Sequence, residues 1–217
     1  MQHTMHIDVI SDTVCPWCFI GKRRLGRALA ARPQIAFEVQ WRAYRLDPTV
    51  PREGYDRKAY LEARFGDGER IRAMGETIRT AGEAEGISFA YDRILRTPNT
   101  TDSHRLVRWA GTAGVQDEVV ERLFRAYFEQ GRDIGDRAVL VAVSAEAGMD
   151  SDLVGELLAQ DADVELVERE DALAHQMGIT GVPTFIFDNK YFTSGAHDPE
   201  GLLQLIDKVV GETAAAG

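Results

Sequence analysis

Cys15-Pro16-Trp17-Cys18 contains both cysteines of this 217-residue chain. Residues 6–10, just before it, alternate as a strand, and the apolar spacing of residues 19–29 after it predicts a helix. Cys15 is therefore expected at a helix N-terminus, where unpaired backbone N–H groups and the helix dipole stabilise a thiolate. Pro16 fits the first helical position, because its missing N–H is not needed there and its φ already matches the helix.

A Cys-x-x-Cys pair can close a disulfide or open to a dithiol, so it can carry two electrons. We expect Cys15 to be the exposed, nucleophilic sulfur and Cys18 to be the buried sulfur that resolves a mixed disulfide. A zinc half-site is one alternative, but it needs a second ligand pair, and there is no other cysteine and no histidine at a ligand spacing. A structural disulfide is another, although closing so short a loop removes little chain entropy. No metal ligand is predicted.

The composition indicates a globular protein with a sizeable core, since 44% of the residues are hydrophobic. The chain has 35 acidic and 25 basic side chains, a net charge of −10, and no basic patch, so we do not expect a nucleic-acid partner. No apolar stretch approaches the roughly 20 residues of a membrane span, and residues 1–6 lack the features of a signal peptide. We expect a cytoplasmic protein without membrane contact, and in a reducing compartment two cysteines are more often catalytic than structural.

Strand signals lie at the two ends of the chain. Residues 35–41 alternate as a strand, which predicts a right-handed βαβ unit with a parallel strand pair. Residues 164–177 form an acidic helix, residues 184–188 and 191–194 form a hairpin, and Pro199 begins the last helix. The side chains expected to face inward on the acidic helix are Val164, Val167, Leu173 and Met177.

The middle of the chain is helical almost throughout, from about residue 56 to residue 161. The sequence therefore predicts two units. One is a discontinuous sheet-containing domain formed by residues 1–50 and 162–217, and the other is an inserted helical domain formed by residues 51–161.

A second motif, Gly181-Val182-Pro183, leads into the predicted hairpin. Together with Cys-x-x-Cys at a helix start it resembles the thioredoxin fold, and the large helical insertion resembles the DsbA family. More narrowly, residues 11–22, the Asn99-Thr100 and His104-Arg105 pairs, and residues 181–185 resemble the FrnE-like branch of that family. The resemblance implies an α/β protein, a thioredoxin-like fold with an all-helical, DsbA-like insertion.

The resemblance also implies that the peptide bond before Pro183 is cis and that the loop faces the disulfide. X-Pro bonds are the common site of cis peptides, and the backbone of Val182 would then offer an edge on which an extended substrate could pair. The alternative is a trans proline at the start of a strand.

Asn99, Thr100 and His104 are candidates for contact with a substrate or glutathione, because the resemblance places them near the active cleft. The alternative is that Asn99 or Thr100 caps a helix and that His104 is a satisfied helix histidine. Trp17 is expected either to form an exposed aromatic platform or to pack against the insertion. FrnE-like proteins can carry a second, distal cysteine pair, and its absence here excludes a two-site relay.

We weigh three functions, of which the first two are enzymatic and the third comes from a different class. The leading one is a thiol–disulfide oxidoreductase that exchanges the Cys15–Cys18 pair with protein substrates or small thiols, with no cofactor besides the redox-active disulfide and with glutathione as a candidate co-substrate. The alternative is a glutathione-dependent enzyme like the kappa-class transferases and 2-hydroxychromene-2-carboxylate isomerases, which do not need a second cysteine, so Cys18 discriminates between the two. The third is a redox-inactive binding module or holdase that presents the insertion.

Overall fold

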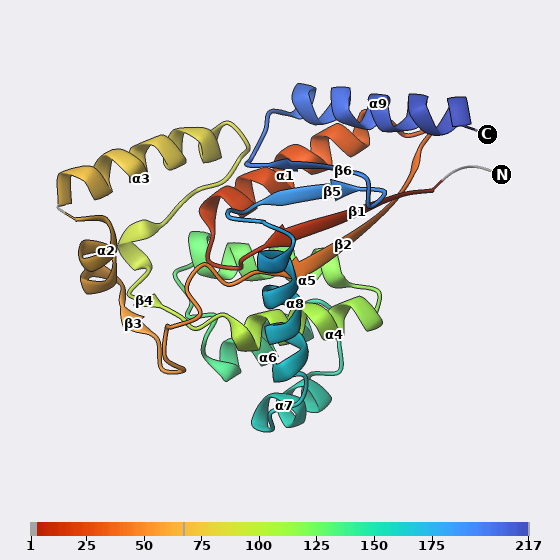
Figure 1. Ribbon diagram of the computed structural model, residues 1–217. Coiled ribbons are helices and arrows are strands. Elements are labelled where there is room, and N and C mark those ends of the chain that lie inside the picture. Colours follow the sequence, from red (N-terminus) through yellow and green to blue (C-terminus); the bar gives the residue numbers. More distant parts are fainter. Residues whose placement is uncertain (1–3, 67, 217) are drawn as a thin grey trace.

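A four-stranded sheet in the order β2-β1-β5-β6 forms the centre of the computed structural model, which describes residues 4–66 and 68–216 (Figure 1). The strands are β1 (Thr4–Ser11), β2 (Ala36–Ala43), β5 (Thr184–Phe187) and β6 (Tyr191–Ser194). β1 is parallel to β2 and antiparallel to β5, and β5 is antiparallel to β6. The predicted parallel pair and the C-terminal hairpin are both confirmed.

β1 lies between β2 and β5, and it leads directly to the cysteines. Met5, Ile7 and Val9 alternate along it and are buried, as the two-residue period of a strand requires. Ile7 pairs with Val39 of β2 on one side and with Phe187 of β5 on the other. Because β1 is a central strand of the sheet, the turn that follows its carboxyl end is surrounded by other elements.

Helices cover both faces of the sheet (Figure 1). α1 (Pro16–Ala30) and α9 (Pro199–Ala216) lie side by side on one face. α4 (Thr101–Thr112), α5 (Gln116–Phe124) and α8 (Val164–Gln176) contact β2 from the other. In the part of the chain that the structure describes, no helix is both long enough and apolar enough to cross a membrane.

The segment between β2 and α8 is mostly helical, as predicted. Besides α4 and α5 it contains α2 (Arg57–Phe65), α3 (Gly68–Glu83), α6 (Arg137–Glu146), α7 (Ser151–Ala159), a 3-10 turn (Tyr91–Arg93) and a π-helical turn (Arg125–Glu129). The departure from an all-helical insertion is a small sheet, in which β3 (Tyr55–Asp56) pairs antiparallel with β4 (Arg96–Thr97). Strands of two residues are too short to show an alternation in the sequence.

The predicted domain boundaries fall in connections, one between β2 and β3 and the other between α7 and α8. The division into two domains stays a prediction. Residues 1–3, 67 and 217 lie outside the described residues.

Phe19 of α1 stacks on Phe124 and Phe128, with ring centroids 5.2 Å and 6.2 Å away. The helix that follows the cysteines therefore shares its apolar core with the inserted segment.

α8 departs from the predicted pattern. Leu173 and Met177 were expected to face inward but are 55% and 56% exposed, so this expectation was wrong. The buried side chains of α8 are Val167, Asp171 and Ala174. Asp171 can lie inward because it accepts hydrogen bonds from the backbone N–H and the Nε–H of Arg45. An inward position that is filled by a paired charge is invisible to apolar spacing.

Candidate active site

Cys15 and Cys18 lie where the chain passes from β1 to α1. Cys15 is the N-cap residue of α1, with φ and ψ of −90° and 113°, and Pro16 is the first helical residue, as predicted. The Cys15 N–H donates to the Asp12 carbonyl at 3.1 Å, and the Cys15 carbonyl accepts the N–H of Cys18 at 3.0 Å. The Cys15 side chain is thereby held at the helix N-terminus, where the dipole favours a negative charge.

Both cysteines are free thiols and both are buried. Cys15 is 4% exposed and Cys18 is 0% exposed, so the order is as expected, but the prediction that Cys15 is an exposed sulfur was wrong. The reason is the loop before β5, because Cys15 Sγ lies 3.7 Å from the carbonyl oxygen of Val182. A helix start is open to solvent only when no other segment crosses it.

The loop that covers Cys15 contains the Val182–Pro183 peptide bond, which is cis. The Pro183 carbonyl accepts the Gly195 N–H at 2.7 Å, which ties the loop to the end of β6. Gly21 of α1 makes room for the loop, since a Cβ there would lie 2.8 Å from Cγ of Pro183. The two sequence motifs, separated by 167 positions between Cys15 and Val182, therefore meet in space.

Burial raises the pKa of the Cys18 thiol well above its ordinary value. A hydrogen bond to Cys15 and repulsion by a charge on Cys15 raise this pKa further, whereas hydrogen bonds from the Ser11 side chain and the Asp12 backbone lower it. Cys18 therefore holds its proton more strongly than an ordinary thiol does.

Asn99, Thr100 and His104 lie at the start of α4. Asn99 donates from Nδ2 to the Val50 carbonyl at 2.6 Å and accepts the Thr101 N–H at Oδ1 at 2.9 Å. Thr100 is the N-cap residue of α4, but its side chain makes no capping bond. Asn99 therefore satisfies a free N–H of this helix end. Contact of these residues with a substrate or glutathione stays a prediction.

Two neighbouring side chains of α4 contact the turn before Cys15. The Nε2 atom of His104 lies 3.3 Å from Oδ1 of Asp12 and 3.2 Å from the Tyr44 carbonyl. Ser103 Oγ lies 2.7 Å from Thr13 Oγ1. Sequence reasoning missed these contacts, because they join positions 90 and 92 residues apart. The only local signal was the polar pair, Asp12 and Thr13, just ahead of the cysteine motif.

Arg105, the neighbour of His104, has a structural role at the end of α7. Its side chain is fully buried and donates to Oδ1 of Asp102 at 2.7 Å. It also donates to the carbonyls of Leu157, Gln160 and Ala162 at 2.6 to 2.7 Å. These carbonyls lie at and beyond the end of α7, where a helix leaves its last carbonyls without partners. Arg105 therefore joins α4 to the end of α7.

The family of the chain is decided by a match over most of its length. Residues 6–207 match the family of DSBA-like thioredoxin domains. The chain belongs to this family. The DSBA-like chain is similar to the solved structure of a probable DsbA oxidoreductase from Streptomyces coelicolor, with 32% identity, a TM-score of 0.88, and 96% of this chain and 91% of that chain covered. The predicted thioredoxin-like fold with a DsbA-like insertion is confirmed.

Two more distant solved structures share the fold of this DSBA-like chain. One is a 2-hydroxychromene-2-carboxylate isomerase, with 14% identity, a TM-score of 0.74, and coverage of 98% of this chain and 99% of that chain. The other is the cytosolic disulfide reductase DsbM from Pseudomonas aeruginosa with GSH, with 19% identity, a TM-score of 0.65, and coverage of 99% and 100%.

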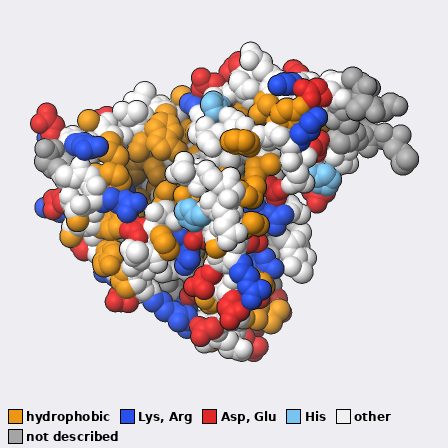
Figure 2. Space-filling view, viewed as in Figure 1, with side chains coloured by type: hydrophobic (Ala, Val, Ile, Leu, Met, Phe, Trp, Pro, Cys, Tyr) orange, Lys and Arg blue, Asp and Glu red, His pale blue; other side chains and the backbone are white. Residues whose placement is uncertain are grey.

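Trp17 of the DSBA-like motif is half-buried and packs against the core, so it is neither fully exposed nor fully covered. Val14, Phe89 and Tyr91 are likewise partly buried against the core. Figure 2 shows apolar side chains gathered on the face in view, between α3 and the N-terminal end of α1. The end of α1 that carries Cys15 is therefore flanked by apolar surface.

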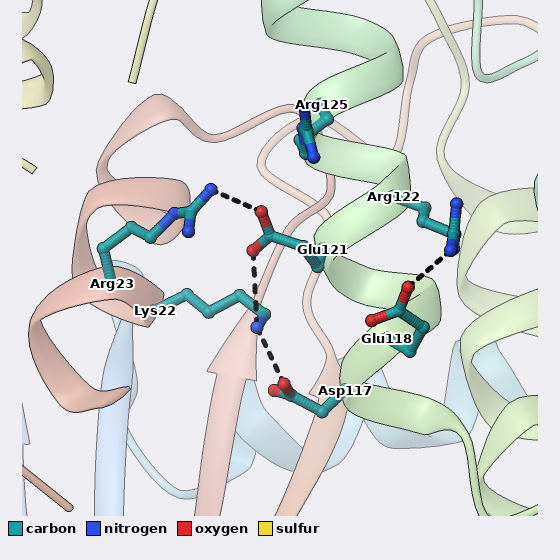
Figure 3. Close-up of a pocket in the computed structure, with 7 residues that line it drawn as sticks. All are labelled: Lys22, Arg23, Asp117, Glu118, Glu121, Arg122 and Arg125. Carbon is teal, nitrogen blue, oxygen red and sulfur yellow. Dashed lines mark hydrogen bonds and ion pairs between the residues drawn. The ribbon is translucent and has the colours of Figure 1, made fainter. Parts of the chain in front are cut away.

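A surface pocket of the DSBA-like fold lies between α1 and α5 (Figure 3). The residues that line it are all charged: Lys22, Arg23, Asp117, Glu118, Glu121, Arg122 and Arg125. Lys22 pairs with Asp117 at 2.8 Å, and Arg23 pairs with Glu121 at 2.5 Å. These ion pairs join the two helices and leave little unpaired charge for a ligand.

Among residues 4–66 and 68–216, no three His, Cys, Asp or Glu side chains are grouped to hold a metal ion.

Proposed function

We propose that this DSBA-like protein is a thiol–disulfide oxidoreductase that uses Cys15 and Cys18. The observation that carries the proposal is the arrangement of the two sulfurs. Cys15 caps a helix and lies 3.7 Å from the Val182 carbonyl, and the fully buried Cys18 lies one turn behind it. The family match and the Streptomyces coelicolor relative support the same chemistry.

In the first step, the Cys15 thiolate attacks a substrate disulfide. A bond forms between Cys15 and one substrate sulfur, and the other substrate sulfur leaves as a thiolate and takes up a proton. Cys18 then loses its proton and attacks the Cys15 sulfur, so that the Cys15–Cys18 disulfide forms and the second substrate thiol is released. The substrate gains two electrons and the dithiol loses two. The reverse sequence oxidises a substrate dithiol.

The substrates that we propose are protein disulfides or dithiols and small thiols. The apolar surface beside the N-terminal end of α1 suits an unfolded or extended polypeptide, and the backbone at Val182 suits main-chain pairing. The DsbM structure contains GSH, which supports glutathione as a co-substrate here.

We also propose a cytoplasmic location for this protein. We place it in the FrnE-like branch because of the motifs around Cys15 and Pro183.

The alternative is a glutathione-dependent isomerase or transferase. The shared fold with a 2-hydroxychromene-2-carboxylate isomerase favours it. In that reaction the glutathione thiol is the nucleophile, and a second cysteine has no task. Cys18 is fully buried one turn after Cys15, and both its burial and Cys15 raise its pKa. This position suits a resolving cysteine and favours the dithiol mechanism.

The substitution Cys18→Ser tests the proposal. It leaves the first attack intact and stops the second, so covalent adducts accumulate on Cys15, and turnover in an insulin-reduction assay falls by about a hundredfold or more. Intact mass under non-reducing conditions, after exposure to oxidised glutathione or a disulfide-bonded protein, detects the adduct.

Cys15→Ser is the matched control, and it abolishes both adduct and turnover. Retained turnover in Cys18→Ser without any adduct contradicts the dithiol mechanism and favours the glutathione-dependent alternative.

A further inference from the structure

The start of α4 is bonded to the turn that precedes Cys15. The loop–helix cluster consists of Asp12, Thr13, Ser103 and His104, which are 1%, 3%, 0% and 4% exposed. Buried polar side chains cost free energy unless they are hydrogen-bonded, and here each one has a partner across the contact. The cluster therefore differs from exposed ion pairs, which contribute little.

The hydrogen-bond roles within the cluster follow from the atoms that face His104. Nε2 lies 3.3 Å from Oδ1 of Asp12 and 3.2 Å from the Tyr44 carbonyl oxygen, and both atoms are acceptors. Nε2 therefore carries a hydrogen. The other carboxylate oxygen of Asp12 accepts the Leu46 N–H at 2.8 Å. Two donors, one of them His104, thus face the buried carboxylate.

Asp12 is in contact with both cysteines through its backbone. Its carbonyl accepts the Cys15 N–H at 3.1 Å, and its backbone is hydrogen-bonded to the Cys18 sulfur. Charges interact strongly in a buried, poorly hydrated region. Movement of Asp12, or a change in how its charge is compensated, therefore acts on both sulfurs.

We propose that His104 is a positioning residue for the dithiol and that it acts through Asp12. Its Nε2–H holds the Asp12 carboxylate and offsets the negative charge of the residue whose backbone contacts both cysteines. Without this donor the uncompensated carboxylate disfavours a thiolate on the cysteine pair, so the disulfide becomes more stable relative to the dithiol. The proposal rests on the proposed function, since it concerns the dithiol–disulfide balance that exchange uses.

The test is the equilibrium constant between dithiol and disulfide, measured in a dithiothreitol redox buffer. His104→Leu shifts this constant toward the disulfide by about tenfold, which corresponds to about 1.4 kcal/mol. His104→Gln places an amide N–H near the position of Nε2–H and stays within about twofold of the unmodified protein. His6→Leu is the matched control. His6 also faces a carboxylate, Glu38, at 3.1 Å, but both side chains are more than half exposed, so its loss leaves the constant unchanged.

Asp12→Asn separates an electrostatic role from simple packing. In this background the carboxylate charge is absent, and His104→Leu then shifts the constant by less than about twofold. An equal shift in both backgrounds overturns the proposal, and so does an unchanged constant in a folded His104→Leu protein.

Circular dichroism and thermal unfolding check that each variant is folded. Where His104→Leu does not fold, His104→Asn takes its place, because its shorter amide does not reach Asp12. His104→Asn is expected to shift the constant as His104→Leu would, and equal constants for the Asn and Gln variants overturn the proposal.

The two proposals fail in different ways. A protein that forms the Cys15–Cys18 disulfide but turns over no substrate disulfide contradicts the proposed function. The comparison between the His104 variants still decides the role of His104, because it measures the protein's own cysteine pair.

Discussion

Cys15 and Cys18 are three positions apart, and one helical turn gives them different chemistry. Cys15 has the helix N-terminus in front of it, whereas Cys18 is inside the helix and has no exposed surface. Burial raises the pKa of the Cys18 thiol, and a negative Cys15 raises it again. The two thiols therefore differ in burial, and in the proposed function this difference makes Cys15 the attacking sulfur and Cys18 the resolving one.

Alkylation should show this difference directly. In the reduced protein, iodoacetamide at pH 7 to 8 is expected to modify Cys15 faster than Cys18, because burial raises the pKa of the Cys18 thiol and so lowers its thiolate fraction. Cys18→Ser keeps the fast modification and Cys15→Ser loses it, as intact mass would report. Fast labelling of the Cys15→Ser protein would reverse the assignment of roles.

At the residue scale, the sequence predicts what depends on near neighbours. The helix start, the place of Pro16 and the deeper position of Cys18 all follow from a few adjacent residues. The burial of Cys15 and the bond between Asp12 and His104 depend on where a distant loop and helix dock, and no local pattern encodes that.

At the element scale, α1 has to pass close to the loop that covers the cysteines. A Cβ at Gly21 would lie 2.8 Å from Cγ of Pro183 and 3.2 Å from Cζ of Phe185. Gly26, on the same helix, has no atom within 4 Å of such a Cβ. The two glycines therefore serve as a matched pair for testing this approach.

We expect Gly21→Ala to destabilise the protein by about 1–2 kcal/mol, because the cost of overpacking exceeds the gain in helix propensity. Gly26→Ala should stabilise it by about 0.5–1 kcal/mol, since only the propensity changes. Urea unfolding of the two variants measures both free energies. Equal stabilisation by both would mean that α1 and the Pro183 loop are not in tight contact.

Elements with a regular apolar period are predictable from the sequence, and those built on paired charges or on two residues are not. β1, α1 and the hairpin follow the expected patterns. The inward face of α8 includes Asp171, which is buried because Arg45 lies opposite it. β3 and β4 have two residues each, so their pairing leaves no alternating pattern in the sequence.

At the scale of the whole molecule, buried tyrosines link stability to pH. Burial raises the pKa of Tyr127 from 10.0 to about 12. Its hydroxyl donates to the Arg96 carbonyl and accepts from Arg57, both at 3.1 Å. A folded-state pKa above the unfolded value means that this group's contribution is complete below pH 10 and is lost as the pH rises toward 12.

The free energy of unfolding is therefore expected to fall between pH 10 and pH 12, with Tyr127 responsible for about 2–3 kcal/mol of the fall. Tyr127→Phe should be less stable at pH 8, because it loses the two hydrogen bonds, but its stability should fall less steeply above pH 10. Every other titrating group is common to both proteins, so parallel curves would contradict the role given to Tyr127.

The strand order also determines how late in synthesis the loop that covers Cys15 becomes available. β1 obtains one neighbour, β2, soon after it is made, but its other neighbour, β5, lies near the far end of the chain. Cys15 is separated by 167 residues from Val182, the residue whose carbonyl covers it. At about 5–20 residues per second, a ribosome needs roughly 10–30 s to add them. Throughout that time the nascent chain carries an uncovered pair of thiols, so the two cysteines meet the redox environment of the cell before the fold can govern their reactivity.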